Sequence, residues 1–361
     1  MLSSSVGVEP AATQPRLRRL ECLRGAAAFY VFLHHYVHVV VTPHVAWVGK
    51  LFKFGQFAVL LFFVVSGFVI YYSTIAREPE LRFRPYFIRR FRRIYPPFLL
   101  ALLITWVAEC IYEGALADPH WLELLGNVLM LQDTNVASWF EPYLRNAALW
   151  SLSYEWSFYL LFFATHLALK DRVAQQKWAV AGLSVIGFAS YWIYANQISL
   201  FLMYYPIWWS GVEIARELVA SNQVTLRKQW VPIANIALMA GLWAIPVVLA
   251  LRSGTALVMW KHPVIEFRHF VTALVILLAG IGWHRLKWFG FYPLLGVFER
   301  VAPISYGLYI VHYPIVHIAS KYSGPGTPWL PFLWVLPTVL VLAWLIEGWL
   351  QKYVVRWLPA K

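Results

Sequence analysis

Residues 24–35 read Arg-Gly-Ala-Ala-Ala-Phe-Tyr-Val-Phe-Leu-His-His, which places a cation at one end of an apolar run and a pair of histidines at the other. On an α-helix, Arg24 and His35 would lie about 20° apart around the axis and about 16 Å apart along it, whereas His34 would point about 100° away from His35. Ionisable side chains are costly inside a membrane and usually serve a function there. The stretch therefore predicts a membrane helix that carries a functional site on the face shared by Arg24 and His35.

The composition indicates that this helix is one of many. The chain has 361 residues, of which 60% are hydrophobic and 13% are charged, more apolar surface than one soluble core can bury. A helical span needs roughly 20 apolar residues. We therefore expect an all-α polytopic membrane protein, a bundle of about ten transmembrane helices within a domain at 17–355, after a disordered tail at 1–16. The ten apolar runs lie at 23–41, 55–75, 90–111, 147–168, 178–195, 198–215, 231–250, 265–283, 302–320 and 330–350.

The distribution of charge separates a membrane protein from a nucleic-acid binder. The formal net charge is +13, and with a cytoplasmic N-terminus 23 of the 30 Lys and Arg residues fall on the cytoplasmic side. That asymmetry follows the positive-inside rule and predicts two cytoplasmic termini and no nucleic-acid partner. The first apolar run is longer than the core of a signal peptide, so we expect it to remain as a helix. Cys22 and Cys110 should lie on opposite membrane faces, too far apart for a disulfide.

Arginines crowd the start of the third predicted span. Lys would satisfy topology equally well, so the exclusive use of Arg also fits planar, bidentate recognition of phosphate. Both interpretations remain open, lipid headgroups and topology on one side and a phosphorylated cofactor on the other. The cluster consists of Arg89, Arg90, Arg92 and Arg93.

Three later spans carry polar side chains on one face. In the fourth span Ser151, Glu155 and Tyr159 recur every four residues, and in the ninth Ser305, Tyr309 and His312 recur at four and three. A buried Glu155 needs a partner, for which an intramembrane His or Arg is the natural choice, unless it only caps or bonds a neighbouring helix. Ser66 and Gly67 in the second span leave a small-residue surface for either another helix or a ligand.

The longest extracytoplasmic segment spans 112–146 and is acidic, with a stretch at 121–131 apolar enough for a short interfacial helix. It could meet a polar acceptor such as a sugar, or act as a lid. His262 and His269 fall in a later outer loop and helix start, where we expect them to be solvated. The sequence holds no metal-ligand spacing, nucleophile elbow, Walker or Rossmann pattern.

Taken in order, these segments resemble the acyltransferase 3 family of membrane-bound O-acyltransferases over about residues 17–350. Arg24 and His35 resemble the family's Arg-x10-His signature, and residues 62–68 its Phe-Phe-x-x-Ser-Gly-Phe. Residues 89–96 resemble its Arg-x-x-Arg region, 150–155 its Trp-Ser-Leu-Ser-x-Glu, and 305–314 its Ser-Tyr-x-x-Tyr-x-x-His-x-Pro. One departure is Trp156, which stands where the family often has a second acidic residue.

The resemblance implies that an acyl group, usually acetyl, passes from a cytoplasmic acyl-CoA to a hydroxyl of a carbohydrate or lipid-linked glycan at a bacterial inner membrane, with acetyl-CoA as a substrate and no permanently bound cofactor. A hydroxyl must lose its proton as it attacks a thioester, and histidine suits that role near neutral pH. We expect His35 to be the general base and Glu155 an orienting or acceptor-contacting group. Arg24 and the four clustered arginines would bind the CoA phosphates. The substrate contacts would be Ser66, Ser151, Tyr309 and His312.

Two alternatives remain open at the level of sequence. A covalent acyl-His35 intermediate would also fit the residues, as would a membrane transporter or flippase of glycolipid or acyl groups, in which the buried charges act in relay or gating. Transporters often have inverted repeats, and the two halves of this chain show no self-similarity. His34 provides a control, because His35→Ala should abolish transfer and His34→Ala should not.

Overall fold

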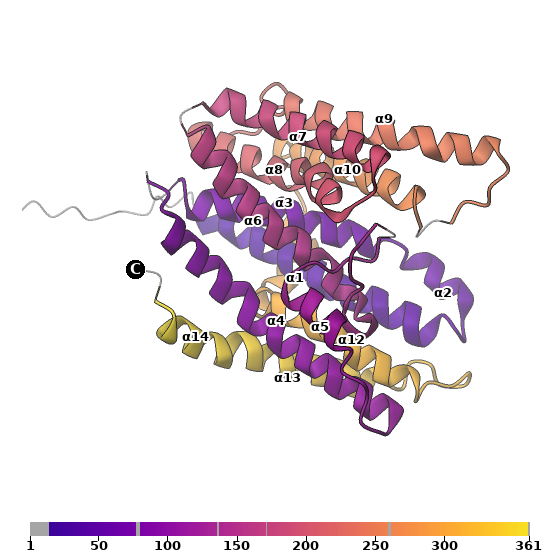
Figure 1. Cartoon of the computed structure of the whole chain (residues 1–361). Helices are drawn as coiled ribbons and strands as arrows, with labels where there is room; N and C mark the ends of the chain where they lie inside the picture. Colours follow the sequence, from indigo (N-terminus) through magenta and orange to yellow (C-terminus); the bar gives the residue numbers. More distant parts are fainter. Residues whose placement is uncertain (1–13, 77–79, 136, 171, 259–260, 360–361) are drawn as a thin grey trace, which may run out of the picture.

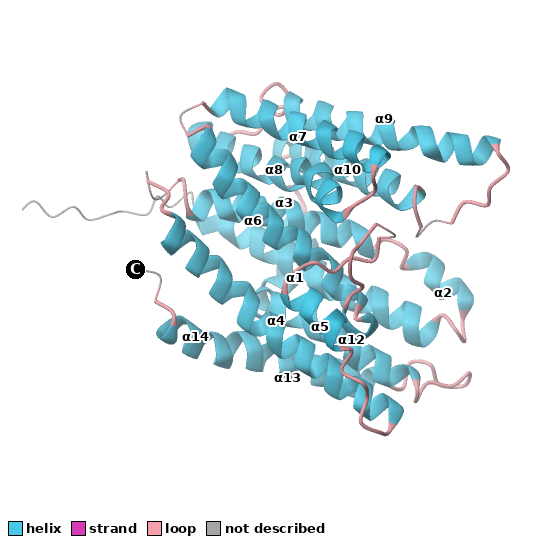
Figure 2. Cartoon of the chain, viewed as in Figure 1, coloured by secondary structure: helices cyan, strands magenta, loops and turns pink. Residues whose placement is uncertain are grey.

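The computed structural model describes residues 14–76, 80–135, 137–170, 172–258 and 261–359, and most of them belong to helices (Figure 1). Figure 2 shows an all-helical chain, and the β-structure of the described ranges is limited to an isolated bridge between Gln132 and Phe140. The expected tail at 1–16 lies outside the described residues up to position 13. The α-helices are α1 Gln14–Tyr36, α2 Ala46–Leu51, α3 Gly55–Ser73, α4 Phe83–Glu113, α5 Trp121–Val128, α6 Trp150–Ala168, α7 Val173–Ile193, α8 Gln197–Ser221, α9 Trp230–Arg252, α10 Val264–Arg285, α11 Phe291–Leu295, α12 Ser305–Ser320, α13 Phe332–Trp344 and α14 Gln351–Trp357.

Each of the ten predicted apolar runs coincides with a helix. Five helical stretches are long and apolar enough by themselves to cross a membrane, namely 46–73, 83–113, 230–252, 264–285 and 332–357. A sixth candidate is the pair 291–300 and 302–320, which is bent by 49°. A polytopic all-α protein is therefore supported, while the number ten stays a prediction. The short helix expected at 121–131 is present as α5.

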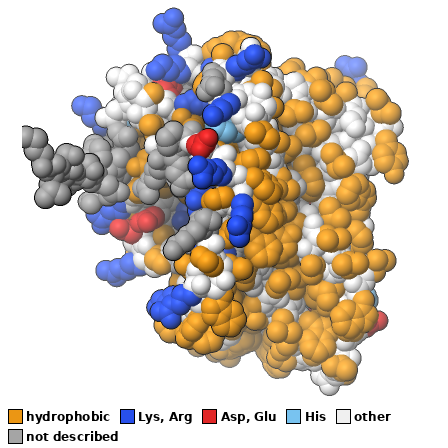
Figure 3. All heavy atoms as spheres, turned by 60° about the vertical axis from the view of Figure 1, so that its left-hand side comes forward, with side chains coloured by type: hydrophobic (Ala, Val, Ile, Leu, Met, Phe, Trp, Pro, Cys, Tyr) orange, Lys and Arg blue, Asp and Glu red, His pale blue; other side chains and the backbone are white. Residues whose placement is uncertain are grey.

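Helices α1 and α3 lie in the middle of the bundle. Figure 1 shows α7, α8, α9 and α10 along one side of this pair and α4, α12, α13 and α14 along the other, and α1 packs against both α3 and α12. The start of α1 and the end of α14 lie at the same end of the bundle (Figure 1). Lys and Arg side chains gather at that end, while hydrophobic side chains cover most of the remaining face in Figure 3. This arrangement agrees with two termini on one side, and the assignment of that side to the cytoplasm stays a prediction.

Glycines allow α3 and α8 to approach closely. A Cβ on Gly67 would lie 2.0 Å from the carbonyl oxygen of Trp208, and one on Gly211 would lie 1.8 Å from that of Val64. Such small-residue contacts are how membrane helices pack without a hydrophobic driving force. Of the two interpretations of the Ser66–Gly67 surface, helix packing therefore holds for Gly67.

Candidate functional site

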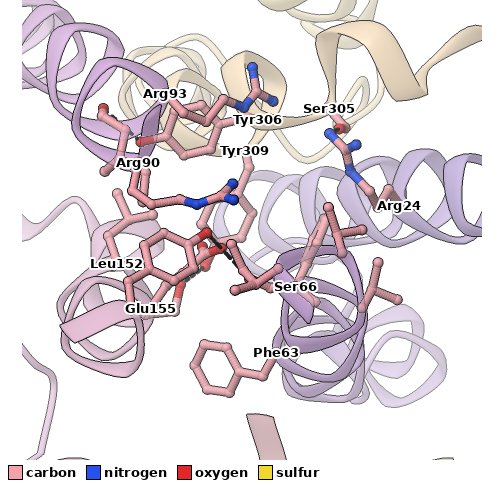
Figure 4. Close-up of a pocket in the computed structure, with 17 residues that line it drawn as sticks. Arg24, Phe63, Ser66, Arg90, Arg93, Leu152, Glu155, Ser305, Tyr306 and Tyr309 are labelled. Carbon is pink, nitrogen blue, oxygen red and sulfur yellow. Dashed lines mark hydrogen bonds between the residues drawn. The ribbon is translucent and has the colours of Figure 1, made fainter. Parts of the chain in front are cut away.

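Seven of the predicted site residues line one cavity of about 200 Å³ between α1, α3, α4, α6 and α12 (Figure 4). We call it the central cavity. Three arginines and one carboxylate face it, so the cavity is positively charged, as a site for anionic groups requires. The seven residues are Arg24, Ser66, Arg90, Arg93, Ser151, Glu155 and Tyr309.

Glu155 is held by hydroxyl groups. Ser66 donates to its Oε1 at 2.7 Å and Tyr159 at 2.5 Å, while Trp208 Nε1 donates to the Ser66 oxygen at 3.2 Å. Two bonds from neutral donors satisfy the carboxylate and leave it facing the cavity (Figure 4). Of the interpretations left open for Glu155, a hydrogen bond to a neighbouring helix therefore holds, because Ser66 of α3 is one of its partners. A direct bond from Glu155 to a histidine or an arginine is not found among the described residues.

The cavity arginines are anchored in different ways. Arg24 donates to Ser305 Oγ at 3.1 Å, so the cation of α1 is fixed to the start of α12. Arg93 forms an ion pair with Glu347, and Glu347 also accepts from the Gly307 amide at 3.2 Å.

Arg90 is the arginine that extends into the central cavity in Figure 4. It donates to Ser73 at 3.1 Å, and its guanidinium lies 5.5 Å from the ring centroid of Tyr86 and 5.9 Å from that of Tyr159. A charge that stacks on aromatic rings can be held in a partly desolvated place and keep donors for a ligand.

A second cavity of about 370 Å³ opens beside the first, at the end of the bundle where the basic side chains gather. We call it the basic cavity. All four clustered arginines line it, and Arg90 and Arg93 line the central cavity as well. The two cavities therefore share a wall of guanidinium groups, and a ligand held by its phosphates in the basic cavity could extend into the central one.

Two prolines of α4 free backbone carbonyls in the arginine cluster, and these carbonyls contact α14. Pro96 and Pro97 have no N–H, so the carbonyls of Arg92 and Arg93, four residues earlier, lose their helical partners. Gln351 of α14 donates its side-chain amide to both, at 3.1 and 3.3 Å. This contact explains why two prolines inside the helix are tolerated.

His35 forms a pair with His312, and neither histidine is among the residues that line the central cavity. His35 Nδ1 is 2.8 Å from His312 Nε2, and the two rings are stacked with their centroids 5.0 Å apart. The Tyr309 ring, which lines the central cavity, lies 6.1 Å from that of His312. The resemblance placed His312 among the substrate contacts, whereas in the structure its nearest polar partner is His35.

The hydrogen-bond network determines the tautomers of the pair. A carbonyl oxygen only accepts, so His312 Nδ1 carries its proton where it meets the Leu308 carbonyl at 3.1 Å. The Nε2 of a neutral His312 then accepts from His35 Nδ1–H. In the part of the chain that the structure describes, His35 Nε2 forms no hydrogen bond. A neutral His35 therefore has an unprotonated Nε2 with a free lone pair, which is what a general base needs.

His34 points away from this pair, as expected. Its Nδ1 bonds the Phe52 carbonyl, and its ring packs where a Cβ on Gly55 would lie 2.4 Å away. His34 is therefore a structural neighbour of the site and remains a suitable control.

The sequence interpretation missed a second polar cluster at the opposite end of the bundle. His269 is 4% exposed, so the expectation that it is solvated is wrong. Asp133 accepts from the Tyr154 hydroxyl at 2.5 Å, and burial raises the pKa of its carboxyl to about 7 even though that hydrogen bond lowers it. The spacing of His262, Glu266 and His269 by four and three residues was the available signal, since it forms a polar stripe on one helix face.

Comparisons with known proteins identify the family to which this chain belongs. The acyltransferase domain family matches residues 17–348. The chain is 32% identical over 187 residues to "Acyltransferase MdmB" of Streptomyces mycarofaciens, which covers 47% of this chain and 45% of that protein, so the chain aligns with less than half of that relative's length. The chain is also 25% identical over 355 residues to "Nodulation protein 10" of Rhizobium leguminosarum bv. viciae. This alignment covers 91% of this chain and 90% of that protein. No solved structure matches. Since the family match spans almost the whole described chain, the protein belongs to the acyltransferase 3 family of membrane acyltransferases.

Proposed function

We propose that this protein transfers an acyl group, acetyl in the simplest case, from a cytoplasmic acyl-CoA to a hydroxyl of a carbohydrate or lipid-linked glycan at a bacterial plasma membrane. The observation that carries the proposal is that the basic and central cavities share Arg90 and Arg93, while Tyr309 of the central cavity lies beside His312 of the histidine pair, with ring centroids 6.1 Å apart. Both relatives are bacterial, and one has acyltransferase in its name.

In this proposal the arginines bind the donor. The guanidinium groups of Arg89, Arg90, Arg92 and Arg93 hold the CoA phosphates in the basic cavity, since each can make two parallel hydrogen bonds to a phosphate. The pantetheine arm then extends through the central cavity past Arg24. Ser66, Ser151 and Tyr309 lie along that path, and Glu155 orients the hydroxyl groups of the cavity wall.

His35 acts as the general base through Nε2. It takes the proton of the acceptor hydroxyl as the oxygen attacks the thioester carbonyl, and the tetrahedral intermediate collapses when the C–S bond breaks. The leaving thiolate takes the proton back from the imidazolium, which returns His35 to its neutral tautomer. His312 positions the ring by accepting from Nδ1–H. No covalent acyl-enzyme is needed, and labelled acyl-His35 trapped without acceptor would contradict this route.

The test compares glycans and secreted metabolites from cells with and without the gene by mass spectrometry. A mass difference of one acetyl or one succinyl unit in a hydroxylated product identifies the donor and the acceptor together. Purified protein should then move label from acetyl-CoA to that product. A product that is relocated across the membrane but chemically unchanged would support the transporter alternative and overturn the proposal.

A further inference from the structure

A third cavity, of about 360 Å³, lies away from the arginine-lined site, at the opposite end of the bundle, and we call it the polar cavity. It is bounded by the start of α3, the segment after α5, one face of α6, and the start of α10. Its lining combines aromatic rings with neutral hydrogen-bonding groups, among them Trp150, Tyr204, Thr134 and Asn135. The lining also includes Asp133 and Lys261, and Lys261 is exposed to solvent. Nothing in the proposed path of the donor uses this space.

Two buried polar atoms of the lining have no partner among the described residues. His269 donates or accepts through Nδ1 at 2.7 Å from the Tyr204 hydroxyl, but its Nε2 is buried and unpaired. The side-chain oxygen Oε1 of Gln56 is also buried and unpaired. A buried polar atom without a hydrogen bond costs about 1–3 kcal/mol. Unpaired atoms around a cavity therefore indicate that a polar ligand supplies the missing hydrogen bonds.

The chemistry of the lining fits a sugar ring better than an ion. Hydroxyl groups both donate and accept, so they can satisfy the Gln56 oxygen and His269 Nε2 whichever tautomer the histidine adopts. Aromatic side chains bury the apolar faces of such a ligand, and a few convergent polar groups orient it. Both carboxylate oxygens of Asp133 already accept hydrogen bonds from the protein, Oδ2 from the Tyr154 hydroxyl at 2.5 Å and Oδ1 from the Thr134 amide at 2.6 Å, so the protein itself supplies the partners of this group.

The polar cavity also shares a wall with the catalytic region. On α6, Trp150 and Tyr154 face the polar cavity, whereas their neighbours Ser151 and Glu155 face the central cavity. The Phe63 ring, which lines the central cavity, lies 6.2 Å from both Trp150 and Tyr154. One layer of side chains therefore separates the two spaces.

We propose that the polar cavity binds a sugar ring of the acyl acceptor, which approaches from the end of the bundle opposite the arginine cluster. The role of this sugar as the acyl acceptor rests on the proposed function. Sugar binding in the polar cavity can be measured without any acyl transfer. Gln56 and His269 are then the residues that recognise the hydroxyl groups.

The test places a thiol in the polar cavity. Ile265 lines it, so Ile265→Cys is introduced into the full chain carrying Cys22→Ala and Cys110→Ala, and its rate of modification by N-ethylmaleimide is measured. Glucose, galactose, mannose, rhamnose and N-acetylglucosamine are added singly, with trimethylglycine at equal osmolality as the solute without hydroxyl groups. The matched control is Val275→Cys, on the same helix at a position 52% exposed outside this cavity.

At least one sugar should slow modification at position 265 by about threefold when two-thirds of the sites are filled, because only empty sites react. Position 275 should react at the same rate throughout. Gln56→Leu with His269→Phe should remove the protection while coenzyme A still binds. The proposal is overturned if no sugar protects, if trimethylglycine protects equally, or if protection survives in the double variant. If the unsubstituted protein does not bind coenzyme A, that result counts against the proposed donor site and not against the sugar site. The two measurements therefore distinguish failure of the proposed function from failure of this inference.

Discussion

Replacing His312 tests how the histidine pair works. In the structure His312 touches His35 through a single hydrogen bond between neutral rings, and such a bond contributes about 0.5–1.5 kcal/mol. If His312 only holds His35 in one tautomer, His312→Leu should lower kcat about 2- to 13-fold. This factor is the free energy of the lost hydrogen bond converted to a ratio of rates. His35→Ala removes the base itself and should lower kcat by about 10²- to 10⁴-fold.

The assay follows release of the coenzyme A thiol from acetyl-CoA, with an acceptor fraction prepared from producing cells. His312→Gln provides the conservative variant, because its carbonyl oxygen can accept from His35 Nδ1–H, and most of the activity should return. His34→Ala should leave the rate unchanged, since that side chain bonds the Phe52 carbonyl. The thermal midpoint of each purified variant separates lost catalysis from lost folding.

Two results would refute this reasoning. If His312→Leu loses as much activity as His35→Ala and His312→Gln does not recover it, then His312 takes part in the chemistry and the assigned tautomers are wrong. If a well-folded His35→Ala protein retains full activity, then the base is another group.

Three further outcomes follow from packing and charge. Gln351→Leu leaves the Arg92 and Arg93 carbonyls unpaired, at about 1–3 kcal/mol, and should raise the KM for acetyl-CoA while kcat changes little. Gly67→Ala forces a Cβ to 2.0 Å from a backbone oxygen and should cost at least about 1–3 kcal/mol in thermal unfolding, whereas Gly182→Ala, with open space around it, should not. The folded chain keeps the Asp133 carboxyl protonated up to about pH 7, whereas the unfolded chain does not. The free energy of unfolding should therefore fall as pH rises from about 4 to about 7, by at most about 1.4 kcal/mol per pH unit. Asp133→Asn should remove this pH dependence, and an unchanged slope in the variant would contradict the assignment.

Much of the architecture could be predicted from local pattern. Runs of about 20 apolar residues bounded by charge must form helices in a membrane, because a backbone without water has to satisfy its own hydrogen bonds. Each of the ten runs is therefore found as a helix, and the all-α class follows. The family resemblance along 17–350 is likewise a property of local motifs, and the match at 17–348 confirms it.

The site was predictable where periodicity along one helix decides which residues share a face. Ser151 and Glu155 do face one cavity, and Arg24 enters the same cavity from α1. Which residues meet across helices was not predictable in this way. Glu155 bonds Ser66 of α3 and Tyr159 of its own helix rather than a histidine, and this outcome depends on how α3 packs beside α6.

The sequence alone determined the inventory and spacing of groups: a helical membrane protein with Arg24 and His35 on one helix, a run of arginines, and isolated polar residues inside apolar spans. Only the tertiary structure decided that His35 bonds His312, that Gln351 satisfies two carbonyls freed by prolines, and that His269 is buried beside the polar cavity. The physical reason is that helix periodicity acts over a few residues, whereas these contacts join positions as far apart as 277 residues in the chain and depend on how whole helices pack.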